Sequence, residues 1–214
     1  MSARPLLVLC AALAVSAPAL AAAPRAPAPA AARLSAQDQA LVDRAAAYLD
    51  GLKEVRARFV QTDARGQVTR GELYLDRPGK ARFEYDKPAT LLVISDGHTV
   101  GVTDRRLKTV DRYPLSSTPL ALFLQKRVTL DNKVEVTGVR RFAGGFSVTM
   151  VDARRKAPGQ ITLAFSDQPM AIREWQVIDA QGGRTTVTIS DLRPVSGLSD
   201  RLFKLPDASP YPIR

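Results

Sequence analysis

Two kinds of hydrophobic pattern follow one another along the chain. Between residues 35 and 52, apolar residues recur at steps of three and four, at Leu41, Val42, Ala45, Leu49 and Leu52. This spacing predicts one amphipathic helix. Ser35, followed by Ala-Gln-Asp, is typical of a helix N-cap. Gly51 weakens the last turn, so we expect the helix to end near that residue.

From residue 55 onward the period changes to two, as Val55, Ala57 and Phe59 alternate with Arg56 and Arg58. Turn residues such as Pro78-Gly79 and Asp96-Gly97 separate short runs of this kind. The pattern predicts strands at 55–61, 72–76, 81–85, 91–94, 98–103, 107–112, 134–141, 146–151, 160–165, 172–179 and 185–192. About eleven antiparallel strands at this spacing indicate a mainly β (α+β) protein whose sheet curls into a barrel or half-barrel.

A second, short helix interrupts the strands. Ser116-Ser117-Thr118 is expected to cap it, with Pro119 at its first position. The apolar residues that follow, Leu120, Leu122, Phe123 and Leu124, cover most of its sides, so it must be buried. The concave face of a curled sheet offers that burial. Two helices are too few to fill such a sheet, which leaves two alternatives open: an apolar ligand cavity, or a core filled by side chains.

The first residues are typical of a secretory signal peptide rather than of the fold. Arg4 precedes the apolar run Leu6–Val15, and Ala19-Leu20-Ala21 is a small-x-small cleavage site. We expect a signal peptide over 1–23, an Ala/Pro-rich linker over 24–33 and a single domain over 34–214. The alternative for 1–23 is a short membrane anchor. The signal predicts a periplasmic protein whose leader is removed.

Charge and composition narrow the function classes. The net charge of +10 favours anionic lipid headgroups or acidic partners, whereas an exported protein rarely meets nucleic acid. The only cysteine, Cys10, lies in the signal, and His98 is the only histidine. No G-x-S-x-G motif accompanies His98, so we expect no enzymatic activity, no metal and no cofactor. A periplasmic hydrolase of lipid or glycan is disfavoured for the same reason.

Five short motifs occur in a fixed order. They are Phe59-Val-Gln61, Gly71-Glu-Leu-Tyr-Leu75, Arg77-Pro-Gly-Lys-Ala-Arg-Phe-Glu-Tyr85, Ser95-Asp-Gly97 and Thr118-Pro-Leu120. With them, the chain resembles the LolA family of periplasmic lipoprotein carriers over residues 34–203. The resemblance implies an incomplete antiparallel barrel of about eleven strands, with helices as a lid over a hydrophobic cavity.

The resemblance also implies a function and partners. A member of this family shields lipoprotein acyl chains while ferrying them from the inner to the outer membrane, without enzymatic activity. Its partners would be acylated lipoproteins, an inner-membrane ATP-driven transporter that releases them, and an outer-membrane lipoprotein receptor, with the carrier a monomer. A carrier or sensor of a non-protein lipid that uses the same cavity is the alternative.

The candidate site combines one arginine with an apolar lining. On the residues alone, Arg77 is more simply a solvated turn residue, whereas the resemblance implies that it latches the lid in the empty state. Trp175 packs in the core of its strand or contacts cargo. The residues expected to line the cavity are Phe59, Leu73, Ala81, Phe83, Tyr85, Leu92, Ile94, Leu120, Phe123, Leu124 and Trp175. Gly101 stands where the family commonly has Trp, and Ala81 replaces a frequent Phe, so we expect an altered cavity.

Overall fold

The computed structural model describes residues 34–126, 134–154 and 157–206. The expected signal peptide (1–23) and linker (24–33) lie outside the described residues. Helix α1 (Ala36–Gly51) begins as predicted, because the Ser35 side chain accepts a hydrogen bond from the Asp38 backbone N–H at 3.1 Å. Its buried residues are those of the predicted stripe. Neither α1 nor any other described helix has the length and apolarity needed to cross a membrane.

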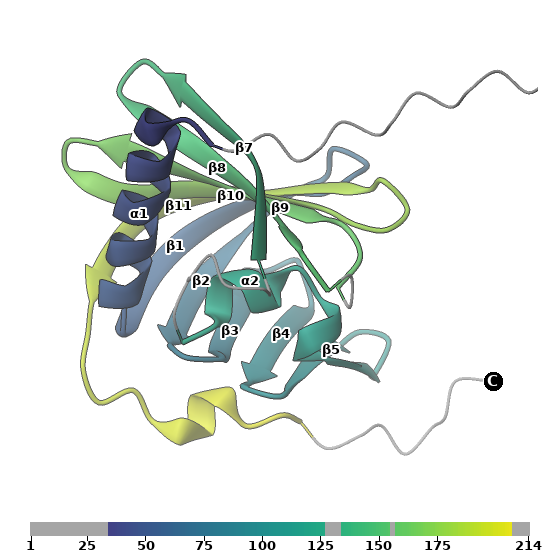
Figure 1. Ribbon diagram of the computed structural model, residues 1–214. Coiled ribbons are helices and arrows are strands. Elements are labelled where there is room, and N and C mark those ends of the chain that lie inside the picture. The colour runs from purple at the N-terminus through teal and green to yellow at the C-terminus, as the bar shows by residue number, and fades with distance from the viewer. Residues whose placement is uncertain (1–33, 127–133, 155–156, 207–214) are drawn as a thin grey trace, which may run out of the picture. The chain divides into compact units, whose positions relative to one another are not determined.

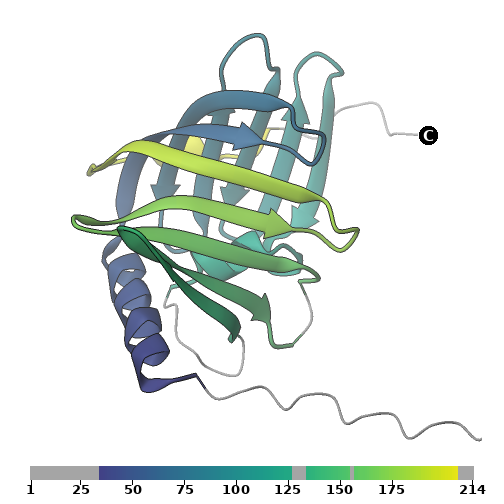
Figure 2. The ribbon, with the colours of Figure 1, turned by 90° about the horizontal axis from the view of Figure 1, so that it is seen from above.

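The strands form one antiparallel sheet that curls around the two helices (Figures 1 and 2). Its spatial order is β6-β5-β4-β3-β2-β1-β11-β10-β9-β8-β7. Within the described residues β6 and β7 are the two ends and do not pair, so the predicted incomplete barrel of about eleven strands is confirmed. The strands are β1 (Glu54–Thr62), β2 (Val68–Asp76), β3 (Lys80–Tyr85), β4 (Leu91–Asp96), β5 (Thr99–Asp104), β6 (Thr109–Pro114), β7 (Val134–Phe142), β8 (Gly145–Asp152), β9 (Gln160–Asp167), β10 (Met170–Ile178) and β11 (Arg184–Pro194).

The inner face of the sheet carries the core. On β1, Val55, Ala57 and Phe59 are at most 2% exposed, and the cross-strand register places them opposite Leu75, Leu73 and Gly71 of β2. Helix α1 and the short helix α2 (Leu120–Leu124) pack onto the same face and belong to the same apolar cluster. Burial of this shared apolar face is what holds a curled sheet against two short helices.

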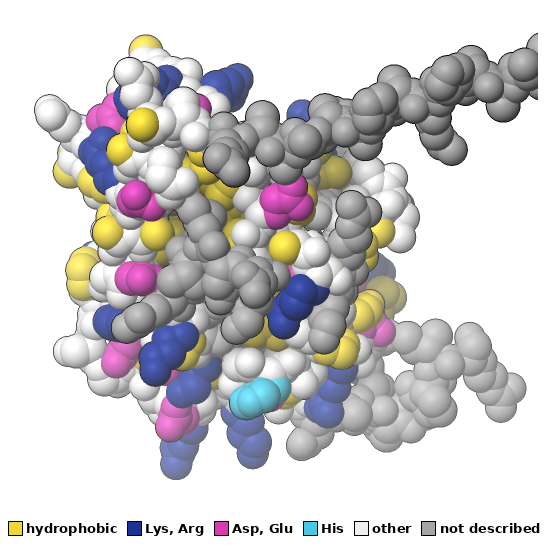
Figure 3. Space-filling model, viewed as in Figure 1, with side chains coloured by type: hydrophobic (Ala, Val, Ile, Leu, Met, Phe, Trp, Pro, Cys, Tyr) yellow, Lys and Arg dark blue, Asp and Glu magenta, His cyan; other side chains and the backbone are white. Residues whose placement is uncertain are grey.

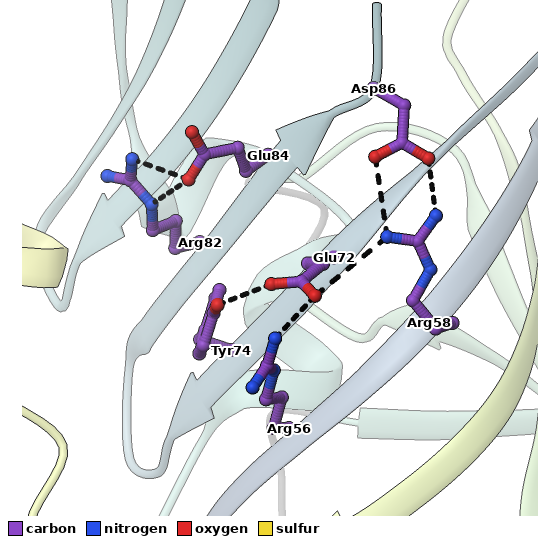
Figure 4. Close-up of polar contacts among 7 residues, drawn as sticks. All are labelled: Arg56, Arg58, Glu72, Tyr74, Arg82, Glu84 and Asp86. Carbon is purple, nitrogen blue, oxygen red and sulfur yellow. Dashed lines mark hydrogen bonds and ion pairs between the residues drawn. The ribbon is translucent and has the colours of Figure 1, made fainter.

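The outer face of β1–β3 is polar, as the period of two predicts. Figure 4 shows Glu72 of β2 between Arg56 and Arg58 of β1, with the Tyr74 hydroxyl donating to Glu72 at 2.5 Å. The hydrogen bonds from Tyr74 and Arg56 lower the pKa of Glu72. Arg58 also pairs with Asp86, and Arg82 with Glu84. These half-exposed pairs contribute little to stability, but they keep the outer face soluble.

The outer face changes character at β4, where the C-terminal segment covers it. After β11 the chain runs through the 3₁₀ turn η2 (Asp200–Phe203) and lies against β3 and β4 (yellow in Figure 1). Arg82 donates to the Leu202 carbonyl at 3.1 Å, and Arg112 of β6 donates to the Pro206 carbonyl at 2.5 Å. Phe203 is only 2% exposed, so this segment is a structural cover.

Two of the expected cavity residues lie under this cover instead of in the interior. Ile94 is opposite Arg82 and Leu92 is opposite Glu84, so both share the outer face. They are buried, yet they do not belong to the core cluster of the inner face. The expectation for Leu92 and Ile94 was wrong because 91–94 is apolar throughout, and such a run does not reveal which side chains face inward.

The expectation that Gly101 alters the cavity was wrong for a related reason. Gly101 of β5 is the partner of Ile94 and therefore also faces outward. A Cβ atom at Gly101 would lie 2.9 Å from Cδ2 of Leu205, so the missing side chain makes room for the C-terminal segment. Ala81, by contrast, is fully buried in the inner core.

This packing predicts the effect of restoring a large residue at position 101. Gly101→Trp should displace Leu205 and lower the free energy of unfolding by about 1–3 kcal/mol, as overpacking does. Urea unfolding measures the loss. The same substitution is also made in a Leu205→Ala variant, where the loss should be smaller because the side chain that Trp would displace is absent. An equal loss in the two backgrounds would contradict the contact between residues 101 and 205.

Candidate functional site

Helix α2 is the part of the lid nearest the predicted latch, and its start differs from the prediction. The 3₁₀ turn η1 (Leu115–Ser117) precedes it, and Pro119 takes the cap position without any capping side chain. The Thr118 hydroxyl donates backward to the Leu115 carbonyl at 2.8 Å, so it serves η1 instead. The expected cap by Ser116, Ser117 and Thr118 was therefore wrong. Buried Leu122, Phe123 and Leu124 confirm that the helix is enclosed.

The C-terminal end of α2 is held by the turn between β2 and β3. The Gly79 N–H donates to the Leu124 carbonyl, and Arg77 Nη2 donates to the Gln125 carbonyl, both at 2.8 Å. The buried Ser95 hydroxyl fixes the turn by donating to the Gly79 carbonyl at 2.7 Å. A Cβ at Gly79 would lie 2.7 Å from the Gly97 Cα, so the β2–β3 turn requires glycine where it touches the β4–β5 turn.

Arg77 is not a solvated turn residue. It is 7% exposed, and its Nε is buried without a hydrogen-bond partner among the described residues. Burial lowers the pKa of Arg77, and the charge of Asp50 on α1 opposes that shift. The guanidinium carbon lies 5.9 Å from the centroid of the Phe123 ring. Arg77 therefore contacts α2 through both a carbonyl and an aromatic face, beside the end of α1.

Phe123 extends this contact into the interior. Its ring stacks on Trp175 of β10 at a centroid distance of 5.3 Å, and Trp175 meets Phe83 edge-on at 6.0 Å. Phe83 and Tyr85 both pack edge-on against Phe59. A continuous row of aromatic rings thus runs from Arg77 at the lid to the far wall of the sheet. Each aromatic pair contributes about 0.5–1.5 kcal/mol beyond its buried area.

Tyr85 places one polar group at the inner end of this row. Its hydroxyl donates to Gln61 Oε1 at 2.7 Å, which joins the first and third sequence motifs. Burial raises the pKa of Tyr85 to about 12, against the smaller effect of that hydrogen bond. A neutral phenol with a satisfied hydroxyl is compatible with an apolar interior.

The aromatic row fills the space in which a cavity was expected. Between α1 and strands β8 and β9 there is a void of about 10 Å³. A larger pocket of about 640 Å³ opens beside α2, against the β2–β3 and β4–β5 turns and Ala157. In Figure 3, which shows this face, Lys and Arg side chains gather along the lower margin, below α2. The described form is therefore closed, with a pocket at the edge of its lid.

Most of the candidate residues come together on the inner face. Phe59, Leu73, Ala81, Phe83, Tyr85, Phe123, Leu124 and Trp175 belong to the buried cluster, and Leu120 packs against it, half-buried. Sequence reasoning missed the parts played by Ser95 and Gly79. Their signal was present, since both lie in the ordered motifs, but only the fold shows that the third and fourth motifs meet at the end of α2, the helix that the fifth motif begins.

Comparisons with known proteins identify the family. The fold and site define an incomplete antiparallel barrel whose interior is closed by a helical lid. Residues 50–206 match the family described as "Outer membrane lipoprotein carrier protein LolA". The chain belongs to the LolA family.

Individual relatives are similar over most of their length. An outer-membrane lipoprotein carrier protein of Chromobacterium violaceum is 36% identical over 186 residues, covering 81% of this chain and 87% of that protein. A protein of the same description from Azotobacter vinelandii is 28% identical over 183 residues, covering 80% and 87%. The crystal structure of a LolA superfamily protein from Nitrosomonas europaea covers 78% of this chain and 97% of its own, with a TM-score of 0.48 and 10% identity.

The buried Tyr85 predicts a stability change at alkaline pH. Its pKa is about 12 in the folded state, against an ordinary value of 10.0, so the unfolded chain loses this proton first. Its contribution is complete below pH 10 and is lost as the pH rises toward 12, by up to about 2–3 kcal/mol. Urea unfolding across this range should show a smaller decline for Tyr85→Phe than for the parent. Tyr113→Phe, at a half-exposed tyrosine, is the control. Equal declines in Tyr85→Phe and the parent would contradict the assignment.

Proposed function

We propose that this protein is a periplasmic carrier that shields the acyl chains of lipoproteins between the inner and the outer membrane. Membership of the LolA family supports the role. The observation that carries this proposal is the stacking of Phe123 on Trp175 beneath Arg77. Through this contact Phe123 of α2 acts as a plug, meaning a side chain that fills the interior and that cargo can replace. Acyl chains would replace the Phe123 ring in the row of aromatic side chains when α2 moves outward.

A filled interior suits a carrier that must both hide its binding surface and release its cargo. An empty apolar cavity open to water would expose a large apolar patch. Every CH₂ group that an acyl chain buries gains about 0.8 kcal/mol, so a rigid, preformed pocket would retain three chains for too long. Closing α2 over the aromatic row offsets part of that gain, because the chains compete with Phe123 for Trp175.

Arg77 acts in this proposal as the latch of the closed, empty form. Its hydrogen bond to the Gln125 carbonyl is charge-assisted, and such bonds contribute about 1.5–3 kcal/mol. Since 1.4 kcal/mol corresponds to a factor of ten, the bond shifts the equilibrium between closed and open forms by roughly 10- to 100-fold. When α2 leaves, the arginine loses both the carbonyl and the Phe123 ring.

The family membership also supports the remaining parts of the proposal. The chain would be exported with removal of residues 1–23 and act as a monomer. It would take acylated lipoproteins from an ATP-driven transporter in the inner membrane and deliver them to a lipoprotein receptor in the outer membrane. A carrier of non-protein lipid would use the same interior. Mass spectrometry of the purified protein separates the two, since triacylated peptides support the first and free lipid the second.

Removing the plug should expose the binding surface. Phe123→Ala should bind an environment-sensitive apolar dye more tightly than the parent, and acyl-chain ligands should displace the dye. The same substitution should lower stability by about 3–5 kcal/mol, because it leaves a hole in a packed row. Phe142→Ala is the matched control at an exposed phenylalanine and should change neither quantity. Unchanged dye binding by Phe123→Ala would contradict the plug.

Removing the latch should trap the loaded form. Arg77→Leu keeps apolar bulk but loses the donors, so lipoprotein should bind about 10- to 100-fold more tightly and leave correspondingly more slowly. Arg77→Lys should be intermediate, because a point charge cannot reproduce the guanidinium fork. The measurement is transfer of labelled lipoprotein from loaded carrier to immobilised receptor. Trp175 is the only tryptophan in the chain, so its emission reports the position of α2. Parental transfer by Arg77→Leu would reduce Arg77 to a packing residue.

A further inference from the structure

Three hairpins meet at the ends of β1, β3 and β5 that lie away from α2. The Asp86 N–H donates to the Arg70 carbonyl at 2.8 Å, which joins the β1–β2 and β3–β4 hairpins. The Arg105 N–H donates to the Thr90 carbonyl at 3.0 Å, which joins the β3–β4 and β5–β6 hairpins. Figure 2 shows the latter two hairpins side by side, projecting on the side opposite α1. We call residues 63–70, 86–90 and 104–108 the hairpin surface.

The acidic side chains of the hairpin surface are engaged locally. Asp63 accepts hydrogen bonds from two backbone N–H groups of its own turn, and Asp86 pairs with Arg58. Asp104 accepts from the Thr90 hydroxyl at 2.7 Å and from the backbone N–H groups of Arg106 and Leu107. These carboxylates are therefore engaged by donors of the hairpins or of β1.

The basic side chains of the same surface point into solvent. They are Arg65, Arg70, Lys87, Arg105, Arg106 and Lys108, and all are exposed. Arg105 has a carboxylate nearby, Glu84 at 3.5 Å. Cations thus outnumber anions on this surface. Such an excess favours a negatively charged partner.

Two large apolar residues are exposed among these cations. Leu107 is 57% exposed at the tip of the β5–β6 hairpin, and Val68 is 52% exposed at the start of β2. Val68 also borders a groove that runs to Pro88 of the neighbouring hairpin. A single exposed leucine needs no explanation, but two exposed apolar side chains among the basic residues of one surface fit a particular kind of partner. Basic residues meet anionic headgroups while short apolar side chains enter the interface between headgroups and acyl chains.

We propose that the hairpin surface docks the protein on anionic phospholipid membranes, with Leu107 as its apolar contact. The surface is separate from the lid, since it lies at the opposite ends of strands β1–β5 from the Gly79 and Gly97 turns that abut α2. Docking holds the carrier beside a bilayer without using its interior. This role does not depend on the nature of the cargo.

The test is binding of the mature protein to vesicles of phosphatidylcholine alone and of phosphatidylcholine mixed with phosphatidylglycerol. The parent should bind the mixed vesicles, and added salt should weaken binding. Each basic residue near an anionic surface strengthens binding about fivefold, so Arg106→Gln with Lys108→Gln should bind roughly 25-fold more weakly. Leu107→Ser should weaken binding at least about tenfold, as loss of a buried leucine side chain does.

The control is Arg140→Gln with Arg141→Gln, which removes the same charge from exposed positions next to the β7–β8 turn. It should bind mixed vesicles like the parent. Equal weakening by the two double variants would overturn the proposal, because net charge alone would then explain binding. No binding of the parent to mixed vesicles would overturn it too and would favour an acidic protein partner. Dye binding by the interior should be unchanged in every variant, so failure of docking is distinguishable from failure of the carrier role.

Discussion

The structure depends on how a buried arginine is accommodated at the edge of an apolar interior. Arg77 is almost fully buried, and burying an ionised group is costly unless the surroundings supply compensation. The compensation is the Gln125 carbonyl at the end of α2 and the face of the Phe123 ring. Both belong to α2 and its C-cap, and the charge of Asp50 on α1 adds to them, so part of the compensation comes from α2. The buried Nε has no hydrogen-bond partner among the described residues, so the compensation they supply is incomplete.

This arrangement gives the lid two opposing properties. The carbonyl contacts from Gly79 and Arg77 hold the end of α2, and the stacking on Trp175 adds dispersion and apolar burial. However, α2 has only five residues and lacks a side-chain cap, so it has little stability of its own. The helix therefore depends on its contacts with the sheet. An element of this kind can be displaced by a ligand that competes for the same apolar surface.

The two faces of the sheet separate the proposed functions. The inner face is an aromatic row that is hidden in the closed form, whereas the outer face carries ion pairs on β1–β3 and the C-terminal cover on β3–β6. The hairpin surface lies at the strand ends away from the lid. Substitutions can therefore test the proposed membrane docking and the proposed cargo binding separately. This separation matters because both proposed functions involve lipid.

The sequence by itself determined the elements whose periodicity is unambiguous. The stripe from Leu41 to Leu49 and the cap at Ser35 specify α1, and alternation of Val55, Ala57 and Phe59 with arginines specifies the inner face of β1. The ordered motifs indicated the family and, through it, Arg77. These features are local, because a period or a cap is decided by residues close together in the chain.

Only the tertiary structure decided which side of β4 faces inward, what Gly101 makes room for, and whether the interior is filled. Leu92 and Ile94 belong to the apolar run 91–94, and the segment that lies against the outer face of β4 comes more than a hundred residues later in the sequence. Phe123 fills the interior because a turn some forty residues earlier in the sequence binds the carbonyls at the end of α2. Contacts between distant segments carry no periodic signal, so they appear only when the chain is folded.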